Sequence, residues 1–210
     1  MHKILILTLI FLLSISTSYL NYLRNESFKI QKLLLYDLNN GFYNYDLDRI
    51  NSLEVNYPSL SINTIPLKAL KARYLTYYGQ NQQALSLLES SLKENPFSQY
   101  TLYLISREYY KTGRLTTSLE YLRKGFEINQ NTPYLSSFYF SLLSSLNLKK
   151  ELTDAFDKII ESDNPEIWKF YYLSIIELSD PDQDFIHSVV KTASNKLNLT
   201  KLEFNEFANK

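Results

Sequence analysis

The chain contains no cysteine among its 210 residues. This absence excludes disulfides, thiolate metal sites, a cysteine nucleophile and a lipid-modified N-terminal cysteine. Glycine and proline are scarce, with four and six residues, which argues against disorder and against a turn-rich β-protein. Neither sign of charge is in excess, because 22 Lys and Arg residues balance 22 Asp and Glu residues. We expect no nucleic-acid partner, since nonspecific binding to phosphates depends on a surplus of cations.

Patterns that indicate catalysis or metal binding are also missing. His2 lies near the N-terminus, and His187 has no second histidine or cysteine beside it. The stretch DPDQD at 180–184 has the acids of a calcium loop, but Phe185 and Lys191 stand where such a loop needs Gly and Glu. No glycine-rich phosphate loop and no G-x-S-x-G nucleophile elbow occurs in the sequence. We therefore expect no enzyme activity, no cofactor, no metal and no small-molecule substrate.

The N-terminal segment differs in composition from the rest of the chain. Lys3 precedes an apolar run at 4–15, and small residues follow at 16–18, an order typical of a secretory signal peptide. An uncleaved anchor is the second interpretation, because residues 4–23 supply the roughly 20 residues of a membrane-spanning helix. A buried first helix is the third. Under the first two, residues 1–24 are a signal peptide or anchor, and the body lies in the cell envelope on the exported side of the membrane.

One spacing recurs in the body of the chain. Gly79, Gly113 and Asn147 follow one another at equal intervals. Asn is the non-glycine residue that best tolerates the left-handed backbone conformation. All three markers can therefore adopt a left-handed turn. Gly41 marks an earlier copy, before an insertion of about four residues. Ala84, Ser118 and Leu152 each stand five residues after a marker, and Leu88, Leu122 and Phe156 each stand nine residues after one. Pro96 is expected to end the first of these repeats and Pro165 the third.

Each repeat is predicted to contain two helices joined by a turn at the marker. Leu67 and Tyr74 fall at helical spacing, and Gly79 ends their helix because glycine reaches positive φ without a Cβ clash. Asn81 is expected to cap the next helix, as Asp180 is expected to cap a later one. A single hairpin cannot bury its apolar face alone, so neighbouring hairpins must stack.

This pattern resembles the tetratricopeptide repeat (TPR) family, whose unit has the same length, about 34 residues. The resemblance covers about 26–197 and is best at 74–96, YLTYYGQNQQALSLLESSLKENP, and next at 109–129, YYKTGRLTTSLEYLRKGFEIN. It implies an all-α fold, an α-solenoid of stacked antiparallel hairpins at 25–198, preceded by one hydrophobic segment and followed by a capping helix or tail at 199–210. The expected repeats are 26–60, 65–98, 99–132, 133–166 and 167–198.

In this family the first helix of each pair lines a concave groove that binds other proteins. The matching places here are Arg73, Thr76, Tyr77, Tyr100, Tyr103, Arg107, Tyr110, Lys111, Tyr134, Ser137, Ser141, Ser144 and Ser145. Tyr and Arg are favoured where proteins meet, since Tyr supplies rigid area and Arg grips carboxylates. The alternative is that many of the 18 tyrosines are core residues. The family's carboxylate clamp is absent, because Ala69 and Arg73 stand in place of its Lys and Asn.

The resemblance therefore implies a non-catalytic protein–protein interaction scaffold of the cell envelope, which holds a partner segment in the concave groove. The alternative is a structural spacer or assembly subunit of an envelope complex, with contacts through its edges and its terminal helix at 199–210. In both cases the partners are other proteins, together with the membrane if the N-terminal segment is uncleaved.

Overall fold

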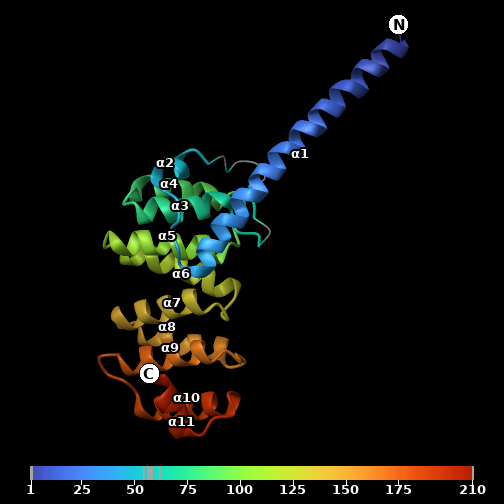
Figure 1. The fold of residues 1–210 in the computed structure, drawn as a ribbon. Coiled ribbons are helices and arrows are strands. Elements are labelled where there is room, and N and C mark those ends of the chain that lie inside the picture. The colour runs from blue at the N-terminus through green and yellow to red at the C-terminus, as the bar shows by residue number, and fades with distance from the viewer. Residues whose placement is uncertain (1, 54, 56–58, 62, 210) are drawn as a thin grey trace. The chain divides into compact units, whose positions relative to one another are not determined.

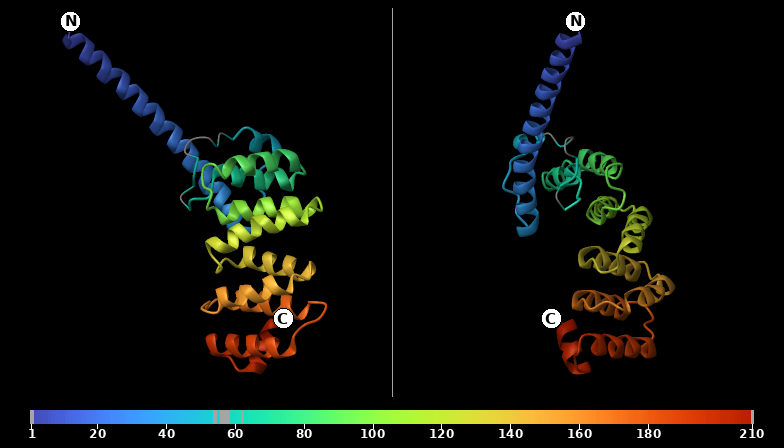
Figure 2. Two further views of the ribbon diagram at one scale, coloured as in Figure 1. Left: turned by 180° about the vertical axis from the view of Figure 1, so that it is seen from behind. Right: turned by 90° about the vertical axis from the view of Figure 1, so that its right-hand side faces the viewer.

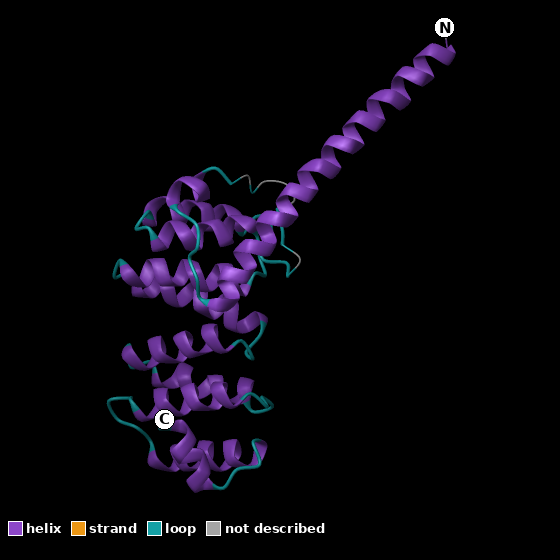
Figure 3. Cartoon of the chain, viewed as in Figure 1, coloured by secondary structure: helices purple, strands orange, loops and turns teal. Residues whose placement is uncertain are grey.

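The chain is all-helical in a computed structural model that describes residues 2–53, 55, 59–61 and 63–209. Eleven helices are formed, and no strand occurs within those ranges (Figure 3). The chain divides into two compact units, Met1–Thr101 and Leu102–Lys210, and the division falls inside one helix. The predicted all-α class is confirmed.

The helices are labelled in Figure 1. Those of the N-terminal unit are α1 (His2–Asn40), α2 (Leu47–Asn51), α3 (Leu67–Tyr77), α4 (Asn81–Ser91) and the start of α5 (Gln99–Lys111). Those of the C-terminal unit are the rest of α5, α6 (Leu115–Ile128), α7 (Pro133–Ser145), α8 (Lys149–Ile159), α9 (Pro165–Ile176), α10 (Gln183–Lys196) and α11 (Lys201–Ala208).

The first helix, α1, is 39 residues long, and it is long and apolar enough to be a signal sequence or to cross a membrane. Residues 3–22 are fully on the surface, and this half of the helix extends away from the rest of the N-terminal unit (Figure 1). The helix passes without a break through position 24, where the leader is predicted to end. The boundary itself stays a prediction.

The second half of α1 is built into the N-terminal unit, where it packs against α3. Leu34 and Leu35 are buried in this contact. Gly41 ends the helix with a φ of 71°. The next helix, α2, has only five residues, so the predicted repeat at 26–60 is not a pair of equal helices. The segment after α2 is rich in Asn, Ser and Pro, which disfavour continued helix; Pro58, at the predicted end of this repeat, lies outside the described residues.

The helices α3 and α4 form a closely packed hairpin around the turn at Gly79. Six positions of the predicted apolar faces are buried, namely Leu67, Leu70, Tyr74, Ala84, Leu88 and Ser91. Tyr78 and Leu92, predicted on the same faces, are half-buried. The prediction that Asn81 caps α4 is wrong. Gln80 occupies the N-cap position without a side-chain hydrogen bond, and Asn81 is the first helical residue. Pro96 lies in the turn between α4 and α5.

The three equally spaced markers adopt the same backbone conformation. Gly79, Gly113 and Asn147 have φ angles of 75°, 74° and 51°. In each case the following residue donates its N–H to the carbonyl five residues earlier, at 2.8, 3.0 and 2.9 Å. This bond is the 6→1 bond of a Schellman cap, which satisfies a carbonyl at the end of a helix. Thus α3, α5 and α7 end by one mechanism, at the positions that the repeat spacing indicates.

The C-terminal unit is held by one apolar core in which α7 packs against α6 and α9. Its largest fully buried side chains come from four helices, namely Phe126, Phe140, Trp168, Tyr171 and Phe204. Figure 2 shows α7, α9 and α10 following one another as successive layers within this unit. Phe204 places α11 against α9, since its ring meets Tyr172 edge-on at 5.7 Å.

Two further local predictions about this unit are wrong. Pro133 and Pro165 do not close repeats, because each is the first residue of a helix, where the missing N–H of proline costs nothing. Asp180 does not cap α10. Asp182 does so, with its carboxylate accepting hydrogen bonds from the backbone N–H groups of Asp184 and Phe185.

Candidate functional site

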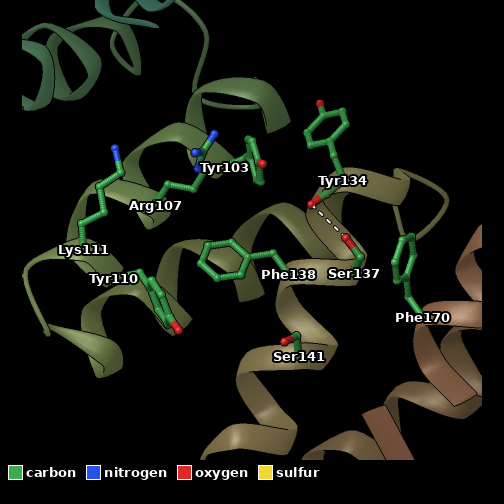
Figure 4. Close-up of a pocket in the computed structure, with 9 residues that line it drawn as sticks. All are labelled: Tyr103, Arg107, Tyr110, Lys111, Tyr134, Ser137, Phe138, Ser141 and Phe170. Atoms are coloured by element: carbon green, nitrogen blue, oxygen red, sulfur yellow. Dashed lines mark hydrogen bonds between the residues drawn. The ribbon is translucent and has the colours of Figure 1, made fainter. Parts of the chain in front are cut away.

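A cavity of about 670 Å³ opens on the surface of the C-terminal unit. Its walls come from three alternate helices of the chain, α5, α7 and α9. Figure 4 shows the lining side chains, namely Tyr103, Arg107, Tyr110, Lys111, Tyr134, Ser137, Phe138, Ser141 and Phe170. Because aromatic rings dominate this set, we call the cavity the aromatic pocket.

Helical spacing explains how α5 presents its part of the pocket. Tyr103, Arg107 and Lys111 follow at intervals of four residues and therefore lie on one face of the helix. The opposite face is fixed in the core, where Leu102 and Ile105 are almost fully buried. The pocket side chains are thus carried by a helix whose orientation is set by apolar packing.

The α7 wall is made in the same way. Tyr134, Ser137, Phe138 and Ser141 recur at intervals of three and four residues, while the fully buried Leu135 anchors the other side of the helix. The two serines add hydroxyl groups to an otherwise apolar wall (Figure 4). Hydroxyls so placed can exchange hydrogen bonds with the backbone of a bound chain.

Contacts between the rings of α5 and α7 hold the aromatic pocket in shape. The Tyr103 ring meets Tyr134 at 5.0 Å, and Tyr110 meets Phe138 edge-on at 5.3 Å between ring centres. Tyr110 nevertheless keeps 47% of its surface exposed. Desolvation raises the pKa of Tyr134 to about 12, so this phenol is neutral at ordinary pH. The pocket therefore offers preformed aromatic area, part of which is exposed.

The charge of the pocket is positive. Arg107 and Lys111 stand on the α5 side, and Phe170 stands on the far side (Figure 4). The Lys111 ammonium pairs with Glu108 at 2.9 Å. The Arg107 guanidinium lies 5.6 Å from the centre of the Tyr103 ring, and no carboxylate within the described part of the chain pairs with it. The described lining residues include no acid, and Glu108 already pairs with Lys111, so Arg107 is the cation that an incoming carboxylate would meet without a competing ion pair.

Most of the predicted groove residues of two repeats meet in this pocket. The structure brings together Tyr103, Arg107, Tyr110, Lys111, Tyr134, Ser137 and Ser141. Ser144 is buried and Ser145 is exposed, and neither lines the pocket. Tyr100 lies in the N-terminal unit and is half-buried. The role of these residues in binding stays a prediction.

Phe138 and Phe170 were not predicted, although both line the pocket. The repeat register fails between α7 and α9, because their starting prolines, Pro133 and Pro165, lie closer together in the sequence than successive turn markers do. Each phenylalanine stands five residues after the proline that begins its helix, so the two are equivalent positions of α7 and α9. This position is not among the groove places that the resemblance implies, so neither phenylalanine was predicted.

The remaining predicted groove residues lie in the N-terminal unit, where the chain covers Arg73 but leaves Tyr77 58% exposed. Arg73 is only 8% exposed, and its guanidinium lies 3.9 Å from the centre of the Tyr43 ring. Tyr43 also stacks on Tyr77, with ring centres 4.0 Å apart. Tyr43 belongs to the segment 42–46 after α1, which we call the strap. Because the strap covers Arg73, this residue is not presented to solvent as Arg107 is.

The strap is fastened by a buried carboxylate. Asp37 accepts hydrogen bonds from the backbone N–H and the side-chain amide of Asn44, at 3.0 and 2.7 Å, and from the Tyr74 hydroxyl. Burial alone would raise the pKa of Asp37, but these hydrogen bonds and the nearby Arg73 charge bring it below its usual value. Asp37 is therefore a charged acceptor that joins α1, the strap and α3.

A scan of protein-family models finds no match to the chain, and a search of curated proteins finds none either. Among the described residues, no group of three or more His, Cys, Asp or Glu side chains is placed to hold a metal ion. The aromatic pocket and α1 are the two features of the chain from which a function is inferred.

Proposed function

We propose that the protein is a membrane-tethered, non-catalytic scaffold whose TPR-like helix pairs stack as a solenoid and bind a segment of another protein. The aromatic pocket is the binding site. One observation carries the proposal: three successive first helices contribute exposed rings, two cations and hydroxyl groups to one open cavity. Exposed Tyr and Arg side chains in a concave site are the groups that contribute most of the affinity at protein interfaces.

The tether is proposed to be the first half of α1, residues 4–23, left uncleaved in the membrane of a cell envelope. Four hydroxyl groups in this segment are paired inside the helix, because Thr8, Ser14, Ser16 and Thr17 donate to carbonyls four residues earlier at 2.7–2.9 Å. Such pairing removes the cost of placing hydroxyls in lipid. The helix also continues directly into the packed part of α1. The body is proposed to lie on the exported side.

Site-specific photocrosslinking tests the binding function. A photoreactive amino acid replaces Ser141, which lines the pocket and is exposed, or Ser86 on α4, which is exposed outside the pocket. We expect a discrete adduct from position 141 in native membranes, its loss when Tyr110→Ala is added, and no such adduct from position 86. Equal adducts from both positions, or an adduct insensitive to Tyr110→Ala, would remove the pocket from the account.

N-terminal sequencing of the protein purified from its native membrane tests the tether. An N-terminus at or next to Met1 is expected, together with extraction by detergent but not by alkaline carbonate. A mature N-terminus after residue 16, 17 or 18 would show cleavage, and the protein would then be a released scaffold.

A further inference from the structure

The chain contains two copies of one groove position, and only one of them is covered. Arg73 and Arg107 are separated by the same interval as the turn markers Gly79 and Gly113. Each arginine lies six residues before its marker, on α3 and on α5. They are therefore equivalent positions of two helices that end in the same way.

The covered copy shows what fits over an arginine at this position. The Tyr43 ring lies over the Arg73 guanidinium at 3.9 Å, and the Asp37 carbonyl accepts a hydrogen bond from it at 3.5 Å. Tyr43 is held on its other side by Tyr77. A planar guanidinium is weakly hydrated and stacks well on an aromatic face, so this cover replaces water with a ring and a carbonyl.

The open copy has the same arginine and no cover. Arg107 is exposed, and its guanidinium lies 5.6 Å from the Tyr103 ring of its own helix. Tyr110 and Phe138 leave ring surface beside it, and Lys111 adds a second cation four residues away. At the covered site a ring from another segment lies 3.9 Å over the arginine. At the open site the ring beside Arg107 is Tyr103 of its own helix, at 5.6 Å, and the nearby acid, Glu108, pairs with Lys111.

We propose that the aromatic pocket binds an extended segment of a partner protein in which an aromatic residue is followed within a few residues by an acidic side chain. The ring stacks over the Arg107 guanidinium, as Tyr43 does over Arg73, and the carboxylate is held by Arg107 and Lys111. An internal segment is favoured over a free C-terminus, because the cationic side of the pocket has no amide side chain beside its cations to complete the grip on a terminal carboxylate. The proposal rests on the binding function and adds the chemistry of the ligand.

The strap supplies a probe of this chemistry. Residues 41–48 read GFYNYDLD and contain three aromatic rings, two acids and no cation. A fluorescent peptide of this sequence, acetylated and amidated to remove terminal charges, is titrated with the full chain in detergent and followed by anisotropy. Saturable binding is expected, about tenfold weaker for Arg107→Gln, because loss of a charge-assisted contact of this kind changes affinity by that order.

Matched controls separate specific binding from general charge. Arg114→Gln removes an exposed arginine that also lies over a tyrosine ring, Tyr109, but does not line the pocket, and its affinity should equal that of wild type. A peptide with Tyr43→Ser should bind about tenfold more weakly, as should one with Asp46→Asn and Asp48→Asn. Unchanged unfolding temperatures for both arginine variants exclude a loss of folding.

Several outcomes would overturn this proposal. The proposal is wrong if the strap peptide fails to saturate the wild-type chain at about millimolar concentration. It is also wrong if the peptide binds Arg107→Gln as tightly as it binds wild type. If the peptide instead dissociates a dimer of the chain, the occupant is the strap of a second copy. If free phenylacetate displaces it at equal concentration, the ligand is a small aromatic acid. Pocket-dependent crosslinks that persist without peptide binding would leave the scaffold function standing and remove only this ligand chemistry.

Discussion

Gly125 of α6 lies so close to Leu135 of α7 that no Cβ atom fits between them. A Cβ built on Gly125 would stand 3.2 Å from Leu135 Cγ and nearer still to its Cδ1. Leu135 is fully buried, so a Cβ at position 125 would have to displace its side chain within the core. Gly125 thus permits close approach of two helices, a different use of glycine from the turn at Gly113.

Gly125→Ala should destabilise the C-terminal unit by about 1 kcal/mol. Overpacking costs about 1–3 kcal/mol, and the better helix propensity of alanine offsets about 1 kcal/mol of it. In a Leu135→Ala background the same substitution should stabilise, because the clash is gone and the propensity remains. Urea unfolding of the four proteins measures both signs. A loss of similar size in both backgrounds would contradict the packing assignment.

Gly79→Ala should destabilise the N-terminal unit by about 1–2 kcal/mol, since an L-residue with a Cβ is strained at a φ of 75°. Space is not the cause, because a Cβ at this position would meet nothing within 4 Å. Gly79→Asn should therefore cost less than Gly79→Ala, as the natural Asn147 indicates. Urea midpoints of the two variants decide this. Equal losses would show that the left-handed conformation is not the determinant.

Tyr74→Phe should loosen the strap. The substitution removes the hydroxyl that donates to the buried Asp37 carboxylate, and an acceptor left short of a partner costs about 1–3 kcal/mol. The strap contains aromatic residues that chymotrypsin cleaves after, so its release is measured as faster cleavage at 42–45. Tyr110→Phe, in the other unit, is the control and should leave this rate unchanged. Unchanged cleavage in Tyr74→Phe would remove Asp37 as the fastening group.

Acid should weaken the C-terminal unit partly through Glu151. The hydrogen-bonded Arg123 guanidinium, at 2.5 and 2.8 Å, is the main cause that holds the pKa of Glu151 below its usual value, and the Tyr139 hydroxyl adds to it. The unfolded chain then binds the proton more readily than the folded one. The stabilisation is therefore present above about pH 4.3 and is lost as pH falls through the lower folded pKa.

Glu151→Gln should accordingly lower the urea midpoint at pH 7 and have a smaller effect near pH 3. The expected loss at pH 7 is at most about 1 kcal/mol, because the pair is partly exposed and screened by water. Glu177→Gln, at an exposed position, is the control and should change little at either pH. A loss that grows toward low pH would have the wrong sign for this pair.

The sequence predicts the turns better than it predicts the helix starts. A positive φ leaves a clear signal where glycine or asparagine fills the position, as at Gly79, Gly113 and Asn147, which share one register. Thr64 also has a positive φ and carries no such signal in the sequence. A helix start has several acceptable side chains within a few residues, so Asp182 replaces the expected Asp180 as the cap of α10. The short α2 was missed because the repeat register counts positions and not the Asn, Ser and Pro residues that interrupt a helix.

The sequence predicts those residues of the candidate site that share one face of a single helix. Tyr103 and Arg107 follow from helical spacing within α5, and the structure brings them into one pocket. The cover over Arg73 could not be predicted, because it depends on the path of the strap after α1, which has no regular structure. Phe138 and Phe170 were missed because their position in the helix is not among the groove places that the resemblance implies.

Hydrogen–deuterium exchange on the full chain, alone and with its crosslinked partner, tests most directly where the protein binds. If the aromatic pocket holds the partner segment, exchange slows in the peptides that cover α5 and α7 and is unchanged in α4, on the other unit. Slowed exchange confined to α8, α10 or α11, with none in α5 and α7, would contradict the account.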